Sequence, residues 1–424
     1  MSARRVAIDL GASSGRVAVG QVVDARLEFE IVHRFSNGPA ETPEGLKWDW
    51  DHLLSNIEKG LILAGQGGPI ASIGVDSWAV DYGVVSPSGE VICTPYCYRD
   101  SRTDGVLEAL SSSEKELFWS ETGLQFLPFN TVFQLRSHVL NHPEHFAAGN
   151  QVLLVPDLLH FWLTGVRTME LTNASTTQLL NPASGDWSDA MLSQIPLDRS
   201  YFPPLIEAGT RIGKLLPRFS KHAGLEDTEV IAPATHDTGS AVLAIPLEDT
   251  NASAYISSGT WSLVGLELPS PVITPEAAEA NFSNEGGAFG TTRFLKNVMG
   301  LWILQECMRA WGESDASILV AEAANVIDFA KEFDPDLIEF LHPGTDMPQR
   351  VSNHTGVEPE NRALIVASIL TSLAGKTASV LALAQQIANI EVESINISGG
   401  GSQNDLLNQL IASKTGKRVI AGPV

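Results

Sequence analysis

The sequence predicts an α/β protein made of two related domains. Its 424 residues exceed the size at which a single hydrophobic core stops growing, so two domains are expected. A strand, a short turn of small residues and a second strand occur near the start of each half, at 6–22 and again at 253–268. This spacing places the boundary near Pro246 to Thr250, which gives an N-terminal domain of 1–245 and a C-terminal domain of 246–424.

Composition and charge exclude several classes of protein. With 44% hydrophobic and 18% charged residues, the chain has the material for a core and does not resemble a disordered protein. A formal net charge of -23 argues against a nucleic-acid-binding surface, which would need a basic face. Any phosphate ligand must therefore be held by local backbone donors, a few cations or a metal ion.

The cysteines and apolar stretches indicate a cytoplasmic protein. Cys93, Cys97 and Cys307 do not form a disulfide framework in a chain of this length, so a reducing compartment is expected. We interpret Cys93 and Cys97 as two ordinary thiols, because a zinc site of the usual kind would need a second close pair. Asp9 interrupts the first apolar run too early for a signal peptide. The stretch 363–375 is shorter than the ~20 residues of a membrane span, and we expect a buried helix there instead.

The first 35 residues predict an antiparallel meander with strands at 6–10, 17–22 and 27–31. Glycine and serine fill the first turn, which reads LGASSGR. Its glycines allow positive φ, and its amides and hydroxyls can converge on an anion, although a plain hairpin turn explains the same residues. The turn has neither GK[ST] nor GxGxxG. Asp9, at the strand end beside it, is the candidate carboxylate for Mg²⁺.

The segment 229–240, EVIAPATHDTGS, predicts a short strand, a turn containing proline and a helix that begins at Asp237. Open α/β sheets bind ligands beyond the carboxyl ends of their strands, so Asp237 is the candidate catalytic base. A helix N-cap accounts for the same residue. His236 can bind a substrate hydroxyl or cap the strand end.

A second polar segment, IGVDSWAVDYGVV at 73–85, predicts a pair of strands around Asp76, Trp78 and Asp81. An indole ring with two carboxylates can hold a hydroxylated ligand. Alternatively, Trp78 belongs to the core and Asp76 caps a turn.

The second half contains a hairpin turn at 258–260 and an apolar segment, LKNVMGLWILQ, at 295–305. We expect this segment to form one helix that carries Asn297 and Gln305 two turns apart. The two amides can share one face of that helix, or each can simply be solvated.

Near the C-terminus, a strand at 395–397 leads into Ser398-Gly399-Gly400-Gly401 and then into a helix at 404–415. Consecutive glycines let a flat base or a ribose approach the backbone closely. The start of the following helix favours negative charge. This segment is therefore a candidate nucleotide contact.

Taken in order, these motifs resemble the FGGY carbohydrate kinases of the actin-like ATPase superfamily. They cover nearly the whole chain and read DLGASSGR, GVDSWAVD, YRDSRT, FLPFNT, THDTGSAV, SSGTWSL, NEGG, LKNVMGLWILQ, SGGGSQNDLLNQL and VIAGPV. The combination of LGASSGR, THDT and NVMGLW is far more specific than a single glycine loop. The resemblance implies two duplicated actin-like (ribonuclease H-like) domains, with ATP and a sugar meeting in a cleft between them.

The resemblance also implies roles for residues matched by position. Asp237 would be the base that accepts the proton of the sugar hydroxyl, and the start of its helix is expected to keep it ionised. Asp9 would support Mg²⁺. The sugar would contact His236, Thr238 and the backbone near Ala79. The contacts to ATP would come from Ala12, Ser13, Ser14, Gly15, Arg16, Thr260, Asn297, Gln305 and Gly401.

Two departures from the family pattern carry expectations. Ala79 stands where a glycine is expected, and its methyl group would trim the sugar pocket. The sequence ends with a strand at Val424, whereas family members continue with a further helix. We expect the loss of a packed helix to expose an apolar sheet face and to reduce stability and nucleotide affinity.

The implied activity is ATP-dependent phosphorylation of a ketose. The 1-hydroxyl of L-rhamnulose, in L-rhamnose catabolism, is the expected acceptor, with L-fuculose and D-xylulose as alternatives. A different class remains open, namely a non-catalytic actin-like module in which nucleotide controls the grip on a partner. The expected ligands are a small sugar and Mg-ATP, with neither nucleic acid nor membrane. A monomer is compatible with the sequence, which leaves the oligomeric state open.

Overall fold

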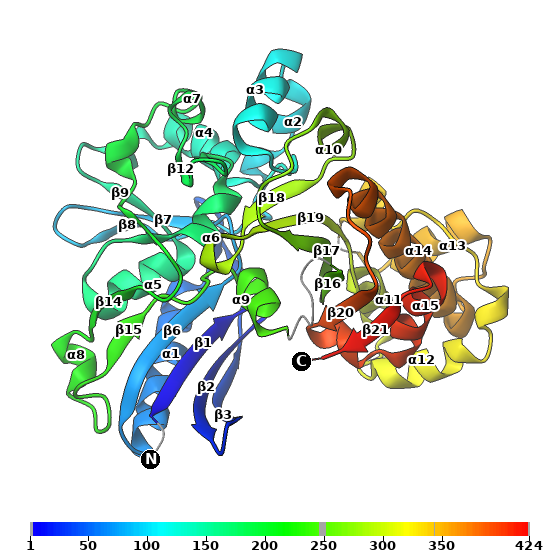
Figure 1. The fold of residues 1–424 in the computed structure, drawn as a ribbon, viewed down its shortest axis with the longest axis horizontal. Helices are drawn as coiled ribbons and strands as arrows, with labels where there is room; N and C mark the ends of the chain where they lie inside the picture. The colour runs from blue at the N-terminus through cyan, green and yellow to red at the C-terminus, as the bar shows by residue number, and fades with distance from the viewer. Residues whose placement is uncertain (1–2, 246–251, 343, 423–424) are drawn as a thin grey trace. The chain divides into compact units, whose positions relative to one another are not determined.

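The computed structural model describes residues 3–245, 252–342 and 344–422 and divides into two compact units (Figure 1). Unit 1 comprises Met1–Ser240 together with Glu285–Thr291, and unit 2 comprises Ala241–Asn284 together with Thr292–Val424. The boundary predicted at Pro246 to Thr250 lies outside the described residues.

A six-stranded sheet forms the centre of unit 1, in the order β14-β15-β6-β1-β2-β3. Strands β1, β6 and β15 run parallel to one another, whereas β2, β3 and β14 are antiparallel to their neighbours. Their bounds are β1 (Arg4–Leu10), β2 (Ser14–Val23), β3 (Arg26–Ser36), β6 (Ile70–Ser77), β14 (Arg211–Lys214) and β15 (Glu229–Ile231). The predicted meander is confirmed.

Smaller sheets surround this one in unit 1. The three-stranded sheet contains β8 (Val91–Cys93), β7 (Tyr82–Val85) and β9 (Gln151–Leu154). Three strand pairs are β4 (Pro39–Thr42) with β5 (Gly45–Trp48), β10 (Met169–Glu170) with β13 (Leu205–Ile206), and β11 (Leu180–Asn181) with β12 (Asp186–Trp187). The helices that begin in this unit are α1 (Trp50–Gln66), α2 (Val106–Ala109), α3 (Ser112–Thr122), α4 (Thr131–Asn141), α5 (Val155–Thr164), α6 (Leu171–Ala174), α7 (Asp189–Leu192), α8 (Pro217–Ser220) and α9 (Asp237–Ala244).

Alternating burial explains how β1 and α1 pack together. In β1 the side chains of Val6, Ile8 and Leu10 are buried while their neighbours are more exposed, as the period of two in a strand requires. Helix α1 begins at an N-cap, where the Asp49 carboxylate accepts a hydrogen bond from the His52 backbone N–H. One face of α1 is apolar and lies in the same hydrophobic core.

Unit 2 is built around a second six-stranded sheet, in the order β18-β19-β17-β16-β20-β21. The strands are β16 (Ser253–Ser258), β17 (Trp261–Leu268), β18 (Ser283–Gly286), β19 (Thr292–Met299), β20 (Ser394–Ser398) and β21 (Arg418–Ala421). The helices are α10 (Pro275–Glu279), α11 (Trp302–Trp311), α12 (Ala316–Ala324), α13 (Met347–Thr355), α14 (Arg362–Ala388) and α15 (Asp405–Thr415).

The two sheets share one topology. In unit 1, the antiparallel series β1, β2, β3 is followed by β6 and β15, which add in parallel on the other side of β1. In unit 2, β16, β17 and β19 form the same antiparallel series, and β20 and β21 add in parallel on the other side of β16. This repeat confirms the duplicated α/β fold that the sequence predicts.

Helix α14 is the buried helix expected near residue 363. By length and composition alone it is apolar enough to cross a membrane, since its mean hydropathy reaches 1.7. However, 67% of that apolar window is buried inside unit 2, as expected for a core helix of a folded domain. The helix begins at Asn361, whose side chain caps the Leu364 N–H, and ends at Asn389 with φ of 52°.

Close packing, rather than positive φ, explains why glycine stands at position 15. Neither Gly11 nor Gly15 in the LGASSGR turn adopts the positive φ that glycine allows. A Cβ added at Gly15 would instead lie 2.3 Å from Cζ of Phe35 on the neighbouring strand. Positive φ occurs at the next turn, at Asp24 and Ala25, as a tight two-residue hairpin requires.

Two other expectations are also wrong. The segment 73–85 does not form a strand pair, because β6 and β7 belong to different sheets. The segment 295–305 is not one helix, because its first half pairs with β17 as strand β19. The chain then turns at Gly300, where an added Cβ would lie 2.6 Å from the carbonyl oxygen of Gly259. Only after this close approach does α11 begin.

We predict that Gly15→Ala destabilises the protein by about 1–3 kcal/mol, because the added methyl group overlaps the Phe35 ring. Urea denaturation measures the change. The matched control is Gly38→Ala, where an added Cβ meets nothing within 4 Å and the effect should stay within about 0.5 kcal/mol. Adding Phe35→Leu to the Gly15→Ala variant should reduce the loss of stability, because the ring that the new methyl group overlaps is removed. Equal stability of the two alanine variants would show that packing does not require glycine at position 15.

Candidate active site

Three carboxylates come together at the carboxyl end of the sheet in unit 1. Asp9 in β1 stands directly opposite Asp76 in β6, because the two strands pair in parallel at that position. Asp237, the first residue of α9, follows β15 in the same sheet. The charges of both Asp9 and Asp237 act on Asp76, so the three groups form one electrostatic cluster. Asp76 lies within a strand, and its interpretation as a turn cap is therefore wrong.

The glycine-serine turn lies beside this cluster. The Gly11 N–H donates to the Ser14 carbonyl at 2.9 Å, and the Asn37 side chain donates to the Gly11 carbonyl at 2.8 Å. Arg16, which stands opposite Asp9 on β2, approaches the Asp9 carboxylate to 3.3 Å. The turn is thus fixed by backbone and side-chain donors, and it carries one cation next to the carboxylates.

Burial dominates the ionisation of these carboxylates. It raises the pKa of Asp9, against the effects of Arg16 and Arg34. Burial and the neighbouring charges of Asp9 and Asp237 raise the pKa of Asp76 well above its usual value. The pKa of Asp237 is also raised, first by burial and then by Asp9, although His236 opposes the shift. Burial therefore opposes the stabilisation of charge that the start of the helix is expected to give Asp237.

The chemistry of this cluster fits a magnesium ion. Mg²⁺ takes oxygen ligands, and it commonly binds through one or two carboxylates while keeping several waters. The charges of Asp9 and Asp237 help to raise the pKa of Asp76, so negative charge is crowded at this end of the strands, and a bound cation would relieve that crowding.

His236 lies between two carboxylates. Its Nε2 is 3.5 Å from Oδ1 of Asp237, and its Nδ1 is 3.4 Å from Oε2 of Glu285 in β18. The His236 side chain is only 8% exposed. On the other side, the backbone N–H and the hydroxyl of Thr238 both donate to Oδ1 of Asp237, at 2.6 and 3.2 Å. One oxygen of Asp237 is therefore held by its own neighbours.

A buried glutamate anchors the backbone that precedes Asp237. Oε2 of Glu170 accepts hydrogen bonds from the N–H and the hydroxyl of Thr235, each at 2.9 Å, and from the Thr172 hydroxyl at 2.5 Å. The Thr235 carbonyl in turn accepts from the Ser77 N–H at 3.0 Å. These contacts tie the segment before α9 to the end of β6, where Asp76 lies.

The turn around Ala79 has a strained backbone. Val80 has φ of 66°, which is unusual for a β-branched residue. Two residues of α4 hold its carbonyl, since the Thr131 hydroxyl donates at 2.7 Å and the Gln134 amide at 3.3 Å. Sparsely populated backbone conformations of this kind cluster at functional sites. Ala79 itself is half-buried, one residue before the strained position.

Asp81 holds this turn and the aromatic residues around it. Its Oδ2 accepts from the indole N–H of Trp48 at 2.7 Å, from that of Trp78 at 3.0 Å and from the Tyr98 N–H at 3.1 Å. Its Oδ1 accepts from the Gln134 amide at 3.0 Å. Trp78 is buried against Trp48, so the alternative that places it in the core is confirmed. Asp81 therefore has a structural role, because its hydrogen bonds hold the turn together.

In unit 2, the predicted nucleotide residues gather around the turn between β16 and β17. The Thr260 hydroxyl donates to the side-chain oxygen of Gln305 in α11 at 3.3 Å. The chain before α11 packs on the same turn, because the Leu301 and Trp302 N–H groups donate to the carbonyls of Gly259 and Thr260. Asn297 lies on β19 opposite Leu263, on the far side of β17 from β16.

The glycine cluster after β20 reaches the same hairpin. Gly399 has φ of 81°, and an added Cβ at Gly401 would lie 2.0 Å from Oγ of Ser258. At Gly400, by contrast, an added Cβ would meet nothing within 4 Å. Gly401 is therefore needed for packing against β16, whereas the backbone at Gly400 has open space beside it.

Each unit thus brings together most of its predicted site residues. Unit 1 collects Asp9, the 11–16 turn and the residues 236–238. Sequence reasoning missed the roles of Asp76, Glu170 and Glu285. The signal for Asp76 was available, since it ends an apolar strand as Asp9 does. Glu170 had no local signal, because it acts through Thr235, 65 positions away.

Comparison with known proteins defines the class. The N-terminal domain of the FGGY family of carbohydrate kinases matches residues 5–244, and the C-terminal domain of the same family matches residues 254–424. The chain therefore belongs to the FGGY family of carbohydrate kinases. Kinases of this family use ATP.

Its full-length relatives narrow the class to rhamnulokinase-like carbohydrate kinases. The chain is 41% identical to the rhamnulokinase of Bacteroides thetaiotaomicron over 424 residues, covering 98% of this chain and 87% of that protein. It is 39% identical to the rhamnulokinase of Halalkalibacterium halodurans, covering 99% of this chain and 90% of the relative. The Bacillus subtilis rhamnulokinase is 37% identical, with coverage of 99% and 87%.

Solved structures confirm the fold. A ligand-bound xylulose kinase from Lactobacillus acidophilus matches with a TM-score of 0.79 at 15% identity, covering 98% of this chain and 85% of that chain. The glycerol kinase of Plasmodium falciparum with ADP matches with a TM-score of 0.75 at 14% identity, covering 99% and 86%. The two-domain fold is therefore that of the sugar and polyol kinases.

Asp81 should make stability depend on pH. Its pKa is raised from 3.8 to about 6, mainly by burial, so its contribution to stability is present below the ordinary pKa and is lost as the pH rises through about 6. Asn cannot titrate. We predict that the free energy of unfolding of Asp81→Asn rises relative to the parent by about 3 kcal/mol between about pH 4 and about pH 7.

Urea denaturation across that pH range measures this difference. The exposed Asp104→Asn serves as the matched control for the loss of one carboxylate. A pH-independent difference for Asp81→Asn would contradict the burial of a titrating carboxylate at this turn.

Proposed function

We propose that this protein transfers the γ-phosphoryl group of Mg-ATP to the 1-hydroxyl of L-rhamnulose. The family membership and the rhamnulokinase names of relatives at 37–41% identity support this substrate. The observation that carries the mechanism is the position of Asp237 at the start of α9, beside Asp9 and Asp76.

In the proposed reaction Asp237 is the general base. The sugar hydroxyl gives its proton to the Asp237 carboxylate as its oxygen forms a bond to the γ-phosphorus. The bond between that phosphorus and the bridging oxygen breaks, and ADP leaves with the electron pair. A raised pKa makes Asp237 a stronger proton acceptor than an ordinary aspartate. His236 and Thr238 fix the carboxylate so that little reorientation is needed.

The remaining residues would bind and orient the substrates. Asp9, with Asp76 beside it, would hold Mg²⁺, which neutralises charge on the phosphate oxygens. The turn from Gly11 to Arg16 would contact the phosphates through its backbone donors and its arginine. In unit 2, the contacts to nucleotide would come from Thr260, Asn297, Gln305 and the backbone of Gly400 and Gly401.

The sugar would contact unit 1. We assign it the backbone near Ala79, the side chain of Thr238 and the edge of His236. Strain at Val80 supports this assignment, because α4 holds the carbonyl there in a fixed direction. The methyl group of Ala79 would limit the size of the sugar at this turn. The domain roles follow, with 1–245 as the sugar-binding and catalytic part and 246–424 as the nucleotide-binding part.

A reducing cytoplasm is the proposed location. Cys93, Cys97 and Cys307 are all free and buried, which suits a compartment that keeps thiols reduced.

The substrate proposal predicts sugar-dependent release of ADP. The purified protein with Mg-ATP should release ADP fastest with L-rhamnulose, and phosphorus NMR of the product should show a phosphate ester at the 1-position. L-fuculose and D-xylulose are the comparison sugars. Faster turnover of either one would overturn the substrate but leave the kinase intact. Tight ATP binding without stimulation by any sugar would favour a non-catalytic nucleotide-binding module.

Asp237→Asn should lower kcat by about 10²–10⁴-fold, because the amide cannot accept the proton. Isothermal titration should show that ATP still binds with nearly the parent affinity. Asp227→Asn is the matched control, since this exposed aspartate only approaches Lys214 at the surface, and it should retain full activity. A parent-like rate for Asp237→Asn would exclude Asp237 as the base.

A further inference from the structure

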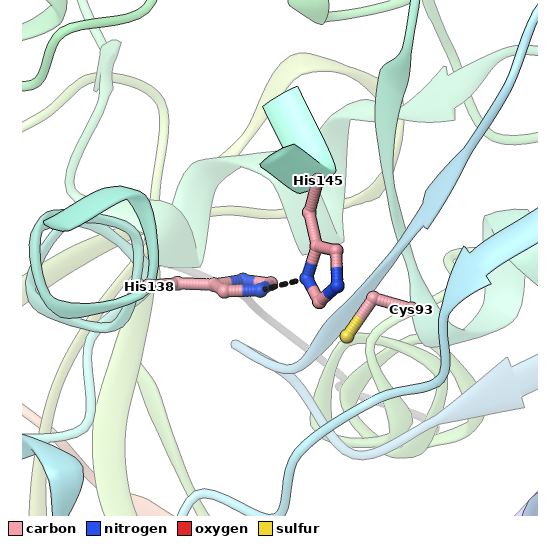
Figure 2. Close-up of side chains that lie close together, drawn as sticks. All are labelled: Cys93, His138 and His145. Carbon is pink, nitrogen blue, oxygen red and sulfur yellow. Dashed lines mark hydrogen bonds between the residues drawn. The ribbon is translucent and has the colours of Figure 1, made fainter. Parts of the chain in front are cut away.

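A cysteine and two histidines form a compact cluster in unit 1, built from three separate elements (Figure 2). Cys93 ends β8, His138 lies on α4, and His145 lies on the short helix η2 (Pro143–Phe146). In Figure 2 the sulfur of Cys93 lies beside the ring of His145, and the ring of His138 lies on the other side of His145. None of these residues has a role in the proposed phosphoryl transfer.

The spacing of the cluster suits a tetrahedral metal ion. One potential ligand atom from each residue lies within 4.8 Å of the others. Zinc bonds of about 2.0–2.1 Å to nitrogen and 2.3 Å to sulfur place tetrahedral ligands about 3.3–3.6 Å apart. Nε2 of His138 is 2.9 Å from Nδ1 of His145, so the two rings would need to separate by only a few tenths of an ångström to accept an ion.

Burial and one hydrogen-bond partner already hold the side chains of Cys93 and His138 in fixed orientations. Cys93 and His138 are 3% and 2% exposed, respectively. The Tyr82 hydroxyl is 2.9 Å from Nδ1 of His138, which leaves Nε2 to face His145. Metal-bound histidines usually have such a partner on the other nitrogen.

We propose that Cys93, His138 and His145 bind one divalent transition-metal ion of the Zn²⁺ type, with a fourth position open to water. One thiolate and two imidazoles are ligands that zinc and its relatives prefer over Mg²⁺ or Ca²⁺. The ion would tie β8 to α4 and η2, two helices that follow one another in the chain through His142.

Neighbouring charges bear on this proposal in two ways. Nζ of Lys47 is 3.8 Å from Sγ of Cys93, and such a cation stabilises a thiolate but repels a metal ion. Lys47 is itself paired with Glu44, which reduces the repulsion. The guanidinium of Arg102 lies 4.0 Å over the Tyr96 ring and adds to the positive surroundings. Loss of the Cys93 proton on metal binding would offset these charges.

The site would be structural. Helix α4 carries His138 towards its end, and near its start it carries Thr131 and Gln134, which hold the strained turn at Val80. A bound ion would therefore stabilise the helix that supports this turn. The inference does not depend on the proposed substrate, and its test does not use kinase activity.

A second group, His142, Glu144 and His145, shares one histidine with the cluster. His142 Nδ1 is 3.2 Å from Glu144 Oε1, and that carboxylate is exposed. This group has no thiolate. A spectroscopic signal from the sulfur therefore distinguishes the two possible sites.

The experiment is a cobalt titration of the full chain, purified without a histidine tag and freed of metal with a chelator. Co²⁺ should bind in a 1:1 ratio and give both the thiolate charge-transfer band and the intense visible bands of tetrahedral cobalt. One equivalent of Zn²⁺ should displace it. Thermal unfolding should move to higher temperature when Zn²⁺ is added.

Variants assign the ligands. Cys93→Ser should abolish the charge-transfer band, and His145→Gln, at a half-buried position that tolerates change, should weaken cobalt binding by more than about 100-fold. Tyr82→Phe should weaken it by about 10-fold. The matched control is Cys97→Ser, which removes another buried thiol and should leave the spectrum unchanged.

Three outcomes would overturn the proposal. The first is the absence of stoichiometric cobalt binding by the parent protein. The second is binding without a thiolate band, or a band that survives in Cys93→Ser. The third is binding that is lost in Glu144→Gln but kept in Cys93→Ser, which would assign the ion to the exposed group instead.

Discussion

The parallel register of β1 and β6 is the constraint on which the site depends. It places Asp9 opposite Asp76 near the carboxyl ends of these two strands. Like charges held side by side repel, and burial increases the cost of ionising them. Arg16 lowers the pKa of both carboxylates, but burial, joined at Asp76 by the charges of Asp9 and Asp237, raises them. The fold therefore concentrates negative charge where we propose that a cation and the phosphates of ATP bind.

Buried hydrogen bonds hold the segments that carry these carboxylates in place. Asp81 fixes the turn after β6, and Glu170 fixes the segment before α9. Both are acids inside the protein, where an unpaired carboxylate is costly, and both accept several donors. Asp237 can consequently be held near other carboxylates without disturbing the sheet. The position of the proposed base, Asp237, therefore depends on residues to which we assign no substrate contact.

Local patterns predicted much of this arrangement. The meander, the glycine-serine turn, the start of α9 at Asp237 and the strand before Gly399 are confirmed, because each depends on residues that are adjacent in sequence. Contacts between distant residues were not predictable in the same way. Asn297 is in a strand because β17 pairs with it, and strand pairing overrode the helical pattern of its segment. The pairing of Glu170 with Thr235 likewise depends on the fold.

The excursion of Glu285–Thr291 into unit 1 means that the chain passes between the units more than once. Glu285, one of the two carboxylates beside His236, is consequently encoded after the point at Ser240 where the chain first leaves unit 1. Dividing the gene at that point would give a first fragment that lacks Glu285 and a second fragment that carries a piece of its neighbour. The duplication visible in the two sheets therefore does not make the halves separable, and any fusion that swapped one half between related kinases would have to carry this segment with the half it serves.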